Sequence, residues 1–134
     1  MPTTSTEALQ IRTPEDIVLV RTAVRKAALS IKFGIVDQTK LVTAASEIAR
    51  NTLDYGGGGE VSIEILQFPK TGVRLVFEDQ GPGIDDIQLA LTDGWTSGSG
   101  MGLGLSGTRR LMDDFELASK PGEGTTVKIT KWSR

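Results

Sequence analysis

The residues best suited to chemistry in this chain are four alternating glycines, Gly98, Gly100, Gly102 and Gly104. Glycines lack a Cβ atom, so backbone N–H groups in such a run can approach phosphate oxygens closely. The run leads into an expected helix, whose N-terminal amides and dipole favour anions. It is not a Walker loop, because no Gly-Lys-Ser or Gly-Lys-Thr follows, and the strand–loop–helix context of a dinucleotide fold is missing. We therefore expect a loop that covers phosphates; the alternative is a flexible linker.

A second candidate is Asp79, which ends an expected strand and is followed by the sequence Gln-Gly-Pro-Gly. The glycines of that sequence, Gly81 and Gly83, indicate a sharp turn with one backbone position at positive φ. A carboxylate at a strand end can accept a hydrogen bond from an exocyclic amine, such as N6 of adenine. The alternative is an aspartate that only caps its own turn.

The third group lies on one expected helix, where Glu47 and Asn51 are four residues apart and therefore share a face. Mg²⁺ prefers oxygen ligands and is often held by one side chain together with substrate phosphates, so Asn51 is a candidate metal ligand. Glu47 is either the base that takes a proton from an attacking hydroxyl or water, or a solvated carboxylate. Arg50 would pair with an acid or contact a phosphate. Thr125, at the start of a strand, would hydrogen-bond adenine or merely favour the strand.

Composition removes several classes of function. The 134 residues carry a net charge of −2 with no basic stripe, so nucleic acid is not an expected partner. No apolar run approaches the length of a membrane span and no leader precedes the domain, so we expect a cytoplasmic protein without a membrane partner. The chain has no cysteine and no histidine, which excludes disulfides, Cys/His zinc sites and histidine acid–base catalysis. Proton transfer would have to use a carboxylate or a lysine.

Hydrophobic periodicity and turn residues predict one α+β domain over residues 1–134, with residues 1–6 disordered. The order of elements implies a two-layer sandwich, in which helices cover one face of a mixed, mostly antiparallel sheet. Thr13 and Pro14 give the start of the first helix. The expected helices span about 14–32, 37–53, 84–92 and 105–114, and the expected strands span 8–12, 61–65, 73–77, 115–119 and 125–132.

Taken together, these motifs resemble the GHKL superfamily, which includes gyrase B, Hsp90, sensor histidine kinases and the MutL group. The resemblance covers about residues 36–129: residues 47–51 match the N box, 79–84 and 98–104 the two glycine boxes, and 124–127 the last segment. The small single domain points to the anti-sigma-factor serine/threonine kinases. Within these, the chain is most similar to the RsbT-type stressosome switch kinases. The segments behind that similarity are 36–38, 46–51, 78–84, 109–113 and 130–132.

The resemblance implies the Bergerat ATP-binding fold, with ATP and Mg²⁺ between the sheet and the long helices. It also implies phosphorylation of a serine or threonine on a STAS-domain partner, followed by binding and activation of a PP2C-type phosphatase. Asn51 would ligate Mg²⁺, Glu47 would be the base, and Asp79 would hold adenine. The other nucleotide-binding residues implied in this way are Gly81, Gly83, Ile84, Gly98, Gly100, Met101, Gly102, Leu103, Gly104 and Thr125.

The expected lid, residues 92–104, departs from several relatives, because Ser97 and Ser99 stand where those relatives place an arginine or lysine. Arg50, or a residue of the partner, would then balance the charge that develops during transfer. Three other functions stay open: a non-catalytic, nucleotide-dependent binding module, an anti-sigma factor that sequesters a sigma factor directly, and an ATPase that releases phosphate to water.

Overall fold

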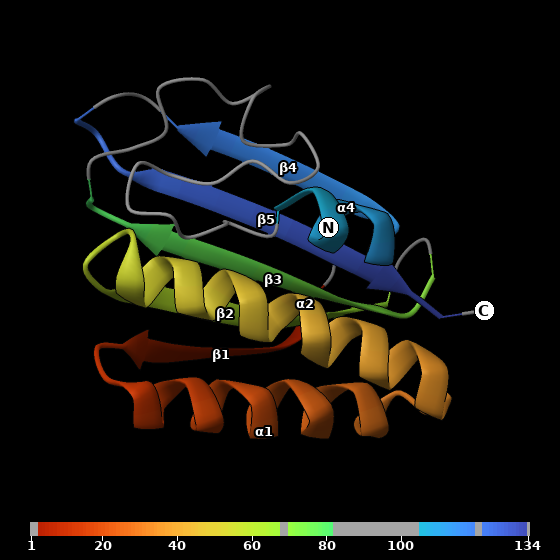
Figure 1. Cartoon of the computed structure of the whole chain (residues 1–134). Coiled ribbons are helices and arrows are strands. Elements are labelled where there is room, and N and C mark those ends of the chain that lie inside the picture. The colour runs from red at the N-terminus through yellow and green to blue at the C-terminus, as the bar shows by residue number, and fades with distance from the viewer. Residues whose placement is uncertain (1–2, 68–69, 82–104, 120–121, 134) are drawn as a thin grey trace.

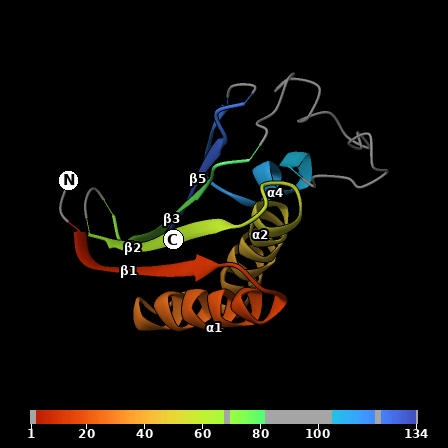
Figure 2. The same cartoon turned by 90° about the vertical axis from the view of Figure 1, so that its left-hand side faces the viewer.

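A computed structural model describes residues 3–67, 70–81, 105–119 and 122–133. Its five strands form one sheet in the order β1-β2-β3-β5-β4, in which every neighbouring pair is antiparallel. The helices lie on one face of this curved sheet (Figures 1 and 2), which confirms the predicted two-layer α+β arrangement. The elements are β1 (Thr3–Ile11), α1 (Pro14–Ser30), α2 (Ile35–Asp54), β2 (Gly59–Leu66), β3 (Gly72–Asp79), α4 (Leu105–Leu111), β4 (Asp114–Ser119) and β5 (Thr125–Trp132).

Helix α1 begins where its sequence signals predict. The Thr13 hydroxyl accepts the backbone N–H of Asp16, and the Asp16 carboxylate accepts the backbone N–H of Thr13, which together make a capping box. The Asp16 carboxylate also accepts the backbone N–H of Arg12 at 2.8 Å, and these hydrogen bonds lower the pKa of Asp16. The start of α1 is therefore fixed by local hydrogen bonds.

The core lies between the sheet and the inner faces of α1 and α2. The predicted inner face of α2 is confirmed, since Leu41, Ala44, Ala45 and Ile48 are all buried. The alanines bring α2 close to α1 and to the sheet, because small side chains allow helices to approach. This packing fixes the direction of α2, whose last turns lie beside the ends of β3 and β5 (Figure 1).

Two boundaries differ from the sequence-based expectation. Residues 3–6, expected to be disordered, belong to β1, because they pair with the outer edge of β2 and satisfy backbone groups that would otherwise be open. The last helix ends at Leu111 and not near Asp114, because the N–H of Asp113 donates to Thr130 O (3.1 Å) and Asp114 begins the pairing of β4 with β5. The expected helix 84–92 lies outside the described residues.

Candidate functional site

A small hollow lies at one end of the sheet, between the last turns of α2 and the paired ends of β3 and β5. The first residue of α4 closes another side. The residues that line the hollow are Ile48, Asn51, Thr52, Tyr55, Phe77, Asp79, Leu105, Thr125 and Val127. The structure thus brings together three of the predicted site residues, Asn51, Asp79 and Thr125.

Asp79 is the last residue of β3 and is only 9% exposed. Burial raises the pKa of its carboxyl group, while hydrogen bonds from the backbone N–H groups of Gly81 and Thr125 oppose that shift. The Gly81 N–H lies 2.9 Å from Asp79 Oδ1. The carboxylate is therefore held in a fixed place at the hollow by backbone donors, where it can accept a further hydrogen bond from a ligand.

Glycines from three different loops enclose Asp79. A Cβ atom on Gly56 would overlap the Asp79 carboxyl group, and one on Gly124 would overlap the backbone carbonyl of Asp79. Gly124 also has a φ of +85°, which side chains disfavour. A Cβ atom on Gly81 would lie 2.7 Å from the backbone of Gly56. The sequence indicated turns at these glycines, but not that Gly56 borders the aspartate.

The walls of the hollow are largely apolar. Phe77 and Val127 each lie two residues from a polar site residue on the same strand, so the strand period places them on the same face. Sequence reasoning missed Thr52, in the last turn of α2, and Tyr55, which directly follows the helix. Their signal was the helical spacing 48, 51, 52 and 55, which puts these residues on one stripe. Apolar walls with a buried acceptor suit a flat heterocycle that carries an exocyclic amine.

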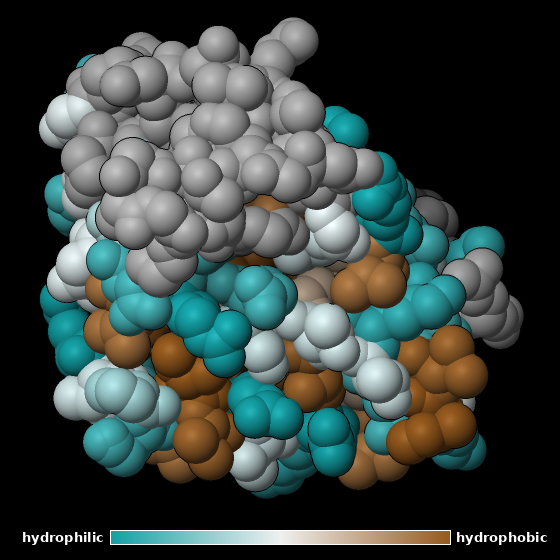
Figure 3. Space-filling view, viewed as in Figure 1, coloured by the Kyte–Doolittle hydropathy of each residue, from teal (hydrophilic) through white to brown (hydrophobic). Residues whose placement is uncertain are grey.

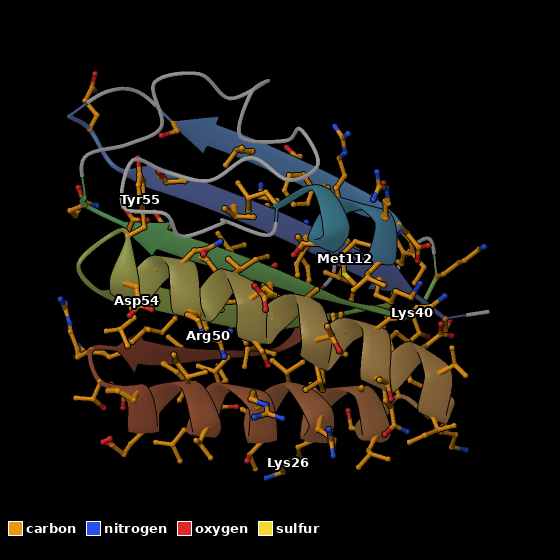
Figure 4. All side chains as sticks on the ribbon, viewed as in Figure 1. Lys26, Lys40, Arg50, Asp54, Tyr55 and Met112 are labelled. Carbon is orange, nitrogen blue, oxygen red and sulfur yellow. The ribbon has the colours of Figure 1, made fainter. Side chains whose placement is uncertain are left out.

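Glu47 does not line this hollow. It lies one helical turn before Asn51, on the side of α2 that borders a groove with α1, and forms an ion pair with Arg50 at 3.4 Å. The side chains are 41% exposed for Glu47 and 54% for Arg50. Figure 4 shows Arg50 on α2 and Tyr55 directly after the end of this helix. The two predicted catalytic side chains thus lie outside the hollow, partly exposed in the groove between α1 and α2.

No cluster of three or more acidic or metal-binding side chains exists among the described residues. Beside Asp79, the amide oxygen of Asn51 and the hydroxyl groups of Thr52, Tyr55 and Thr125 line the hollow, and the amide is the candidate metal ligand. This donor fits Mg²⁺, which commonly takes one or two protein oxygens and completes its shell with phosphates and water. The predicted contacts at Gly83, Ile84, Gly98, Gly100, Met101, Gly102, Leu103 and Gly104 lie outside the described residues.

Comparison of the sequence with known proteins identifies a matching family and several relatives. A family model described as histidine kinase-, DNA gyrase B- and HSP90-like ATPase matches residues 36–133. The chain is 45% identical over 127 residues to the serine/threonine-protein kinase RsbT of Bacillus subtilis, covering 94% of this chain and 96% of the relative. It is 30% identical over 117 residues to an anti-sigma F factor of a Thermoanaerobacter species, covering 84% and 82%.

Two solved structures share the fold. One contains the RsbU and RsbW domains of a Mycobacterium tuberculosis protein and matches with a TM-score of 0.68 at 21% identity, covering 98% of this chain and 33% of that one. The other is the SiaB–SiaC complex of Pseudomonas aeruginosa, with a TM-score of 0.60 at 10% identity over 96% and 89%. Both share the fold of this chain, and the family match over residues 36–133 confirms it as the predicted GHKL-type fold. In the part of the chain that the structure describes, no helix is long and apolar enough to cross a membrane.

Proposed function

This chain belongs to the family of histidine kinase-, DNA gyrase B- and HSP90-like ATPases and is an RsbT-like serine/threonine kinase, and we propose that it phosphorylates a STAS-domain protein. The observation that carries the nucleotide-binding part of this proposal is the buried carboxylate of Asp79 at an apolar hollow that Asn51 also lines, and the similarity to a serine/threonine-protein kinase supports the protein substrate. In the proposed cycle the chain uses cytoplasmic ATP and switches between protein partners.

Asp79 would select adenine. Its carboxylate accepts hydrogen bonds, and adenine presents an N6 amine as a donor. The apolar side chains of Ile48, Phe77 and Val127 would contact the faces and edge of the ring. Thr125, 8% exposed and next to the carboxylate in the strand pairing, would add a hydroxyl near the base. Burial of the base in this hollow would direct the phosphates toward Asn51.

Asn51 would hold Mg²⁺ through its amide oxygen. When bound, the ion neutralises phosphate charge and orients the transferred group. The glycine run 98–104 remains a prediction for the loop that wraps the phosphates. The role of the described residues in this part of the reaction is therefore to position the nucleotide.

Glu47 would accept the proton of the acceptor hydroxyl. Its partly exposed position beside the hollow suits a base that meets its substrate only when another folded protein docks. Arg50, paired to Glu47 at 3.4 Å, would hold this carboxylate in place in the free chain, and Arg50 or a residue of the partner would balance charge near the transferred group. The site would thus be completed by the protein substrate.

The partners are proposed from the resemblance together with the relatives. The serine/threonine kinase of Bacillus subtilis is similar over nearly the whole chain, and a related fold occurs beside an RsbU domain in one solved structure. Another relative in fold forms a complex, SiaB with SiaC. These similarities support a STAS-domain substrate and, after release, binding and activation of a PP2C-type phosphatase.

The test is incubation of the full chain with ATP, Mg²⁺ and a candidate STAS-domain protein, followed by mass spectrometry of that protein. We expect one added phosphoryl group on a serine or threonine. In Glu47→Gln the rate should fall by about a hundredfold or more, the usual contribution of a positioned base, while ADP affinity should stay unchanged. Phosphate that appears only in solution, with none on the protein, would favour an ATPase instead.

A second candidate is an anti-sigma factor, because relatives at about a third identity carry that name. Such a protein would retain the nucleotide site but hold a sigma factor directly. A pull-down with purified sigma factor and STAS-domain protein in parallel separates the two. Retention of the sigma factor alone would replace the kinase–STAS pairing with sequestration.

A further inference from the structure

The outer face of α1 presents an exposed stripe with a basic centre. Arg21, Arg25 and Lys26 form this centre, at spacings of one helical turn or less. Val18 and Leu29 lie at its two ends and are 58% and 56% exposed. Figure 3 shows apolar side chains interspersed with hydrophilic ones over the lower part of the view, where α1 lies, and Figure 4 shows Lys26 on α1. The stripe is therefore amphipathic along its length.

A groove continues this stripe toward α2. Arg21 and Arg25 form one wall, and Glu47 and Arg50 of α2 lie on the other. Three arginines and one glutamate line the groove, and the glutamate is already paired with Arg50. Within the described part of the chain, Arg21 and Arg25 have no ion-pair partner. Their charge is unopposed at this surface.

This local charge contrasts with the whole chain, whose net charge is −2. Arginine and exposed apolar side chains are the groups that protein interfaces use at their centres. A nucleic-acid backbone would match the arginines but not the apolar ends on either side of them. A flat anionic bilayer would not enter the groove between α1 and α2 that Arg21 and Arg25 line. The chemistry that complements both is an acidic protein surface with apolar side chains at its margins.

We propose that the stripe and groove formed by Val18, Arg21, Arg25, Leu29 and Arg50 are the docking surface for an acidic face of a protein partner. The proposal rests on the proposed function in two respects, the identification of that partner with the phosphorylated substrate and the role of Glu47 as the base.

Docking here would also act on the proposed base. An exposed ion pair such as Glu47–Arg50 contributes little to stability, so a partner carboxylate can replace Glu47 beside Arg50. Glu47 is then released toward the acceptor hydroxyl as the substrate arrives. Binding in the groove and proton transfer at Glu47 are coupled by this exchange.

The test compares two double variants that change the net charge equally. Arg21→Gln with Arg25→Gln alters the groove. Lys70→Gln with Lys128→Gln is the matched control, since Lys70 is exposed in the β2–β3 turn and Lys128 lies on β5, where it alternates with the core residues Val127 and Ile129. Two readouts are used: KM and kcat for the STAS-domain substrate, and calorimetric binding of a synthetic helical peptide with glutamates at its centre and leucines at both ends.

The groove variant should raise KM for the protein substrate about tenfold or more and weaken the peptide to a similar degree, with ADP affinity unchanged. The control variant should match the wild type in each measurement. Wild-type binding of the peptide should also weaken as salt rises and should fall when glutamines replace its glutamates.

Several results would overturn the proposal. They are equal behaviour of both double variants, no binding of the glutamate peptide by the wild type, or tighter binding of an oligonucleotide or of phosphatidylglycerol vesicles than of the peptide. Phosphoryl transfer with an unaltered KM in the groove variant would reject the docking surface and leave the kinase intact. Peptide binding that depends on Arg21 and Arg25, without any transfer to a STAS-domain protein, would support the docking surface and reject the proposed substrate.

Discussion

The two ends of the β3–β5 pair each bury a charged side chain, but only one of the two charges has an ion-pair partner among the described residues. At one end the carboxylate of Asp79 is buried against backbone N–H groups, and burial raises its pKa. At the other end Lys131, whose side chain is 3% exposed, lies 3.7 Å from a carboxylate oxygen of Asp37 and 3.7 Å from one of Asp113. The second Asp113 oxygen accepts the N–H of Trp132 at 2.7 Å. The positive charge of Lys131 is therefore balanced by two carboxylates of the same chain.

The difference indicates which end is built for a ligand. Within the described residues no cation lies at ion-pair distance from Asp79, so its negative charge is stabilised only by neutral donors. A buried charge held at such a cost is typical of a functional site. The ion pairs of Lys131 instead join the start of α2, the start of β4 and the end of β5, which is a structural task.

The largest effect should follow from filling the space beside Asp79. Gly124→Ala introduces a Cβ atom against the Asp79 carbonyl at a φ of +85°, and the overlap together with the strain should lower the free energy of unfolding by about 3 kcal/mol. Urea denaturation measures this. Gly107→Ala is the control, because its Cβ would meet nothing within 4 Å. Equal stability of the two variants would mean that the enclosure of Asp79 is loose.

Asp79→Asn separates binding from stability. Asparagine keeps an acceptor for the Gly81 N–H but loses the charge that an adenine amine would meet. We expect ATP affinity to fall about tenfold to a hundredfold, the value of a hydrogen bond to a charged group, with no loss of stability in urea. Unchanged affinity by calorimetry would remove Asp79 from the binding site.

Lys131→Met should give the opposite result. Breaking a buried pair is strongly destabilising, but Asp37 and Asp113 are partly exposed, so we expect a loss of about 1–2 kcal/mol. Nucleotide affinity should stay within about twofold, because the substitution lies at the far end of the strand pair. Lys128→Met, on the same strand, is the control and should change stability by less than about 0.5 kcal/mol. A large loss of ATP binding in Lys131→Met would show that the two ends are coupled.

The smallest effect concerns pH. Because the pKa of Asp79 is raised in the folded protein, the folded state favours its protonated form, and the stability that this provides is lost as pH rises through the raised pKa. Asp79→Asn should therefore be slightly more stable than the wild type at about pH 7. The gap should close at about pH 4, near the ordinary pKa of an aspartate. A gap that widens in acid would contradict the burial of an uncompensated carboxylate.

The parts of the fold and of the candidate site that depend on neighbouring residues in the sequence could be predicted. The capping residue Thr13, the buried face of α2 and the strand that ends at Asp79 all follow from short-range periodicity and turn chemistry. Asn51 was found in the same way, since helical spacing and side-chain chemistry sufficed to place it at the site.

The rest depends on contacts between distant parts of the chain. The start of β1 at Thr3 is set by the open edge of β2, and the end of the last helix is set by the pairing of Asp114 with β5. The overlap of Gly56 with Asp79 and the ion pairs of Lys131 join loops and helices that no local pattern relates. Glu47 shares a helical stripe with Asn51, yet it faces the groove beside α1, because only the packed helices determine which surface borders which side chain.

The central claim, that Asp79 recognises the exocyclic amine of adenine, is tested most directly by calorimetric titration of the wild type and Asp79→Asn with ATP and with ITP, in the presence of Mg²⁺. The two nucleotides carry the same phosphates, but ITP has an oxygen where adenine has N6. The wild type should bind ATP about tenfold to a hundredfold more tightly than ITP, and the variant should lose that preference. Equal affinity of the wild type for both nucleotides would contradict the account.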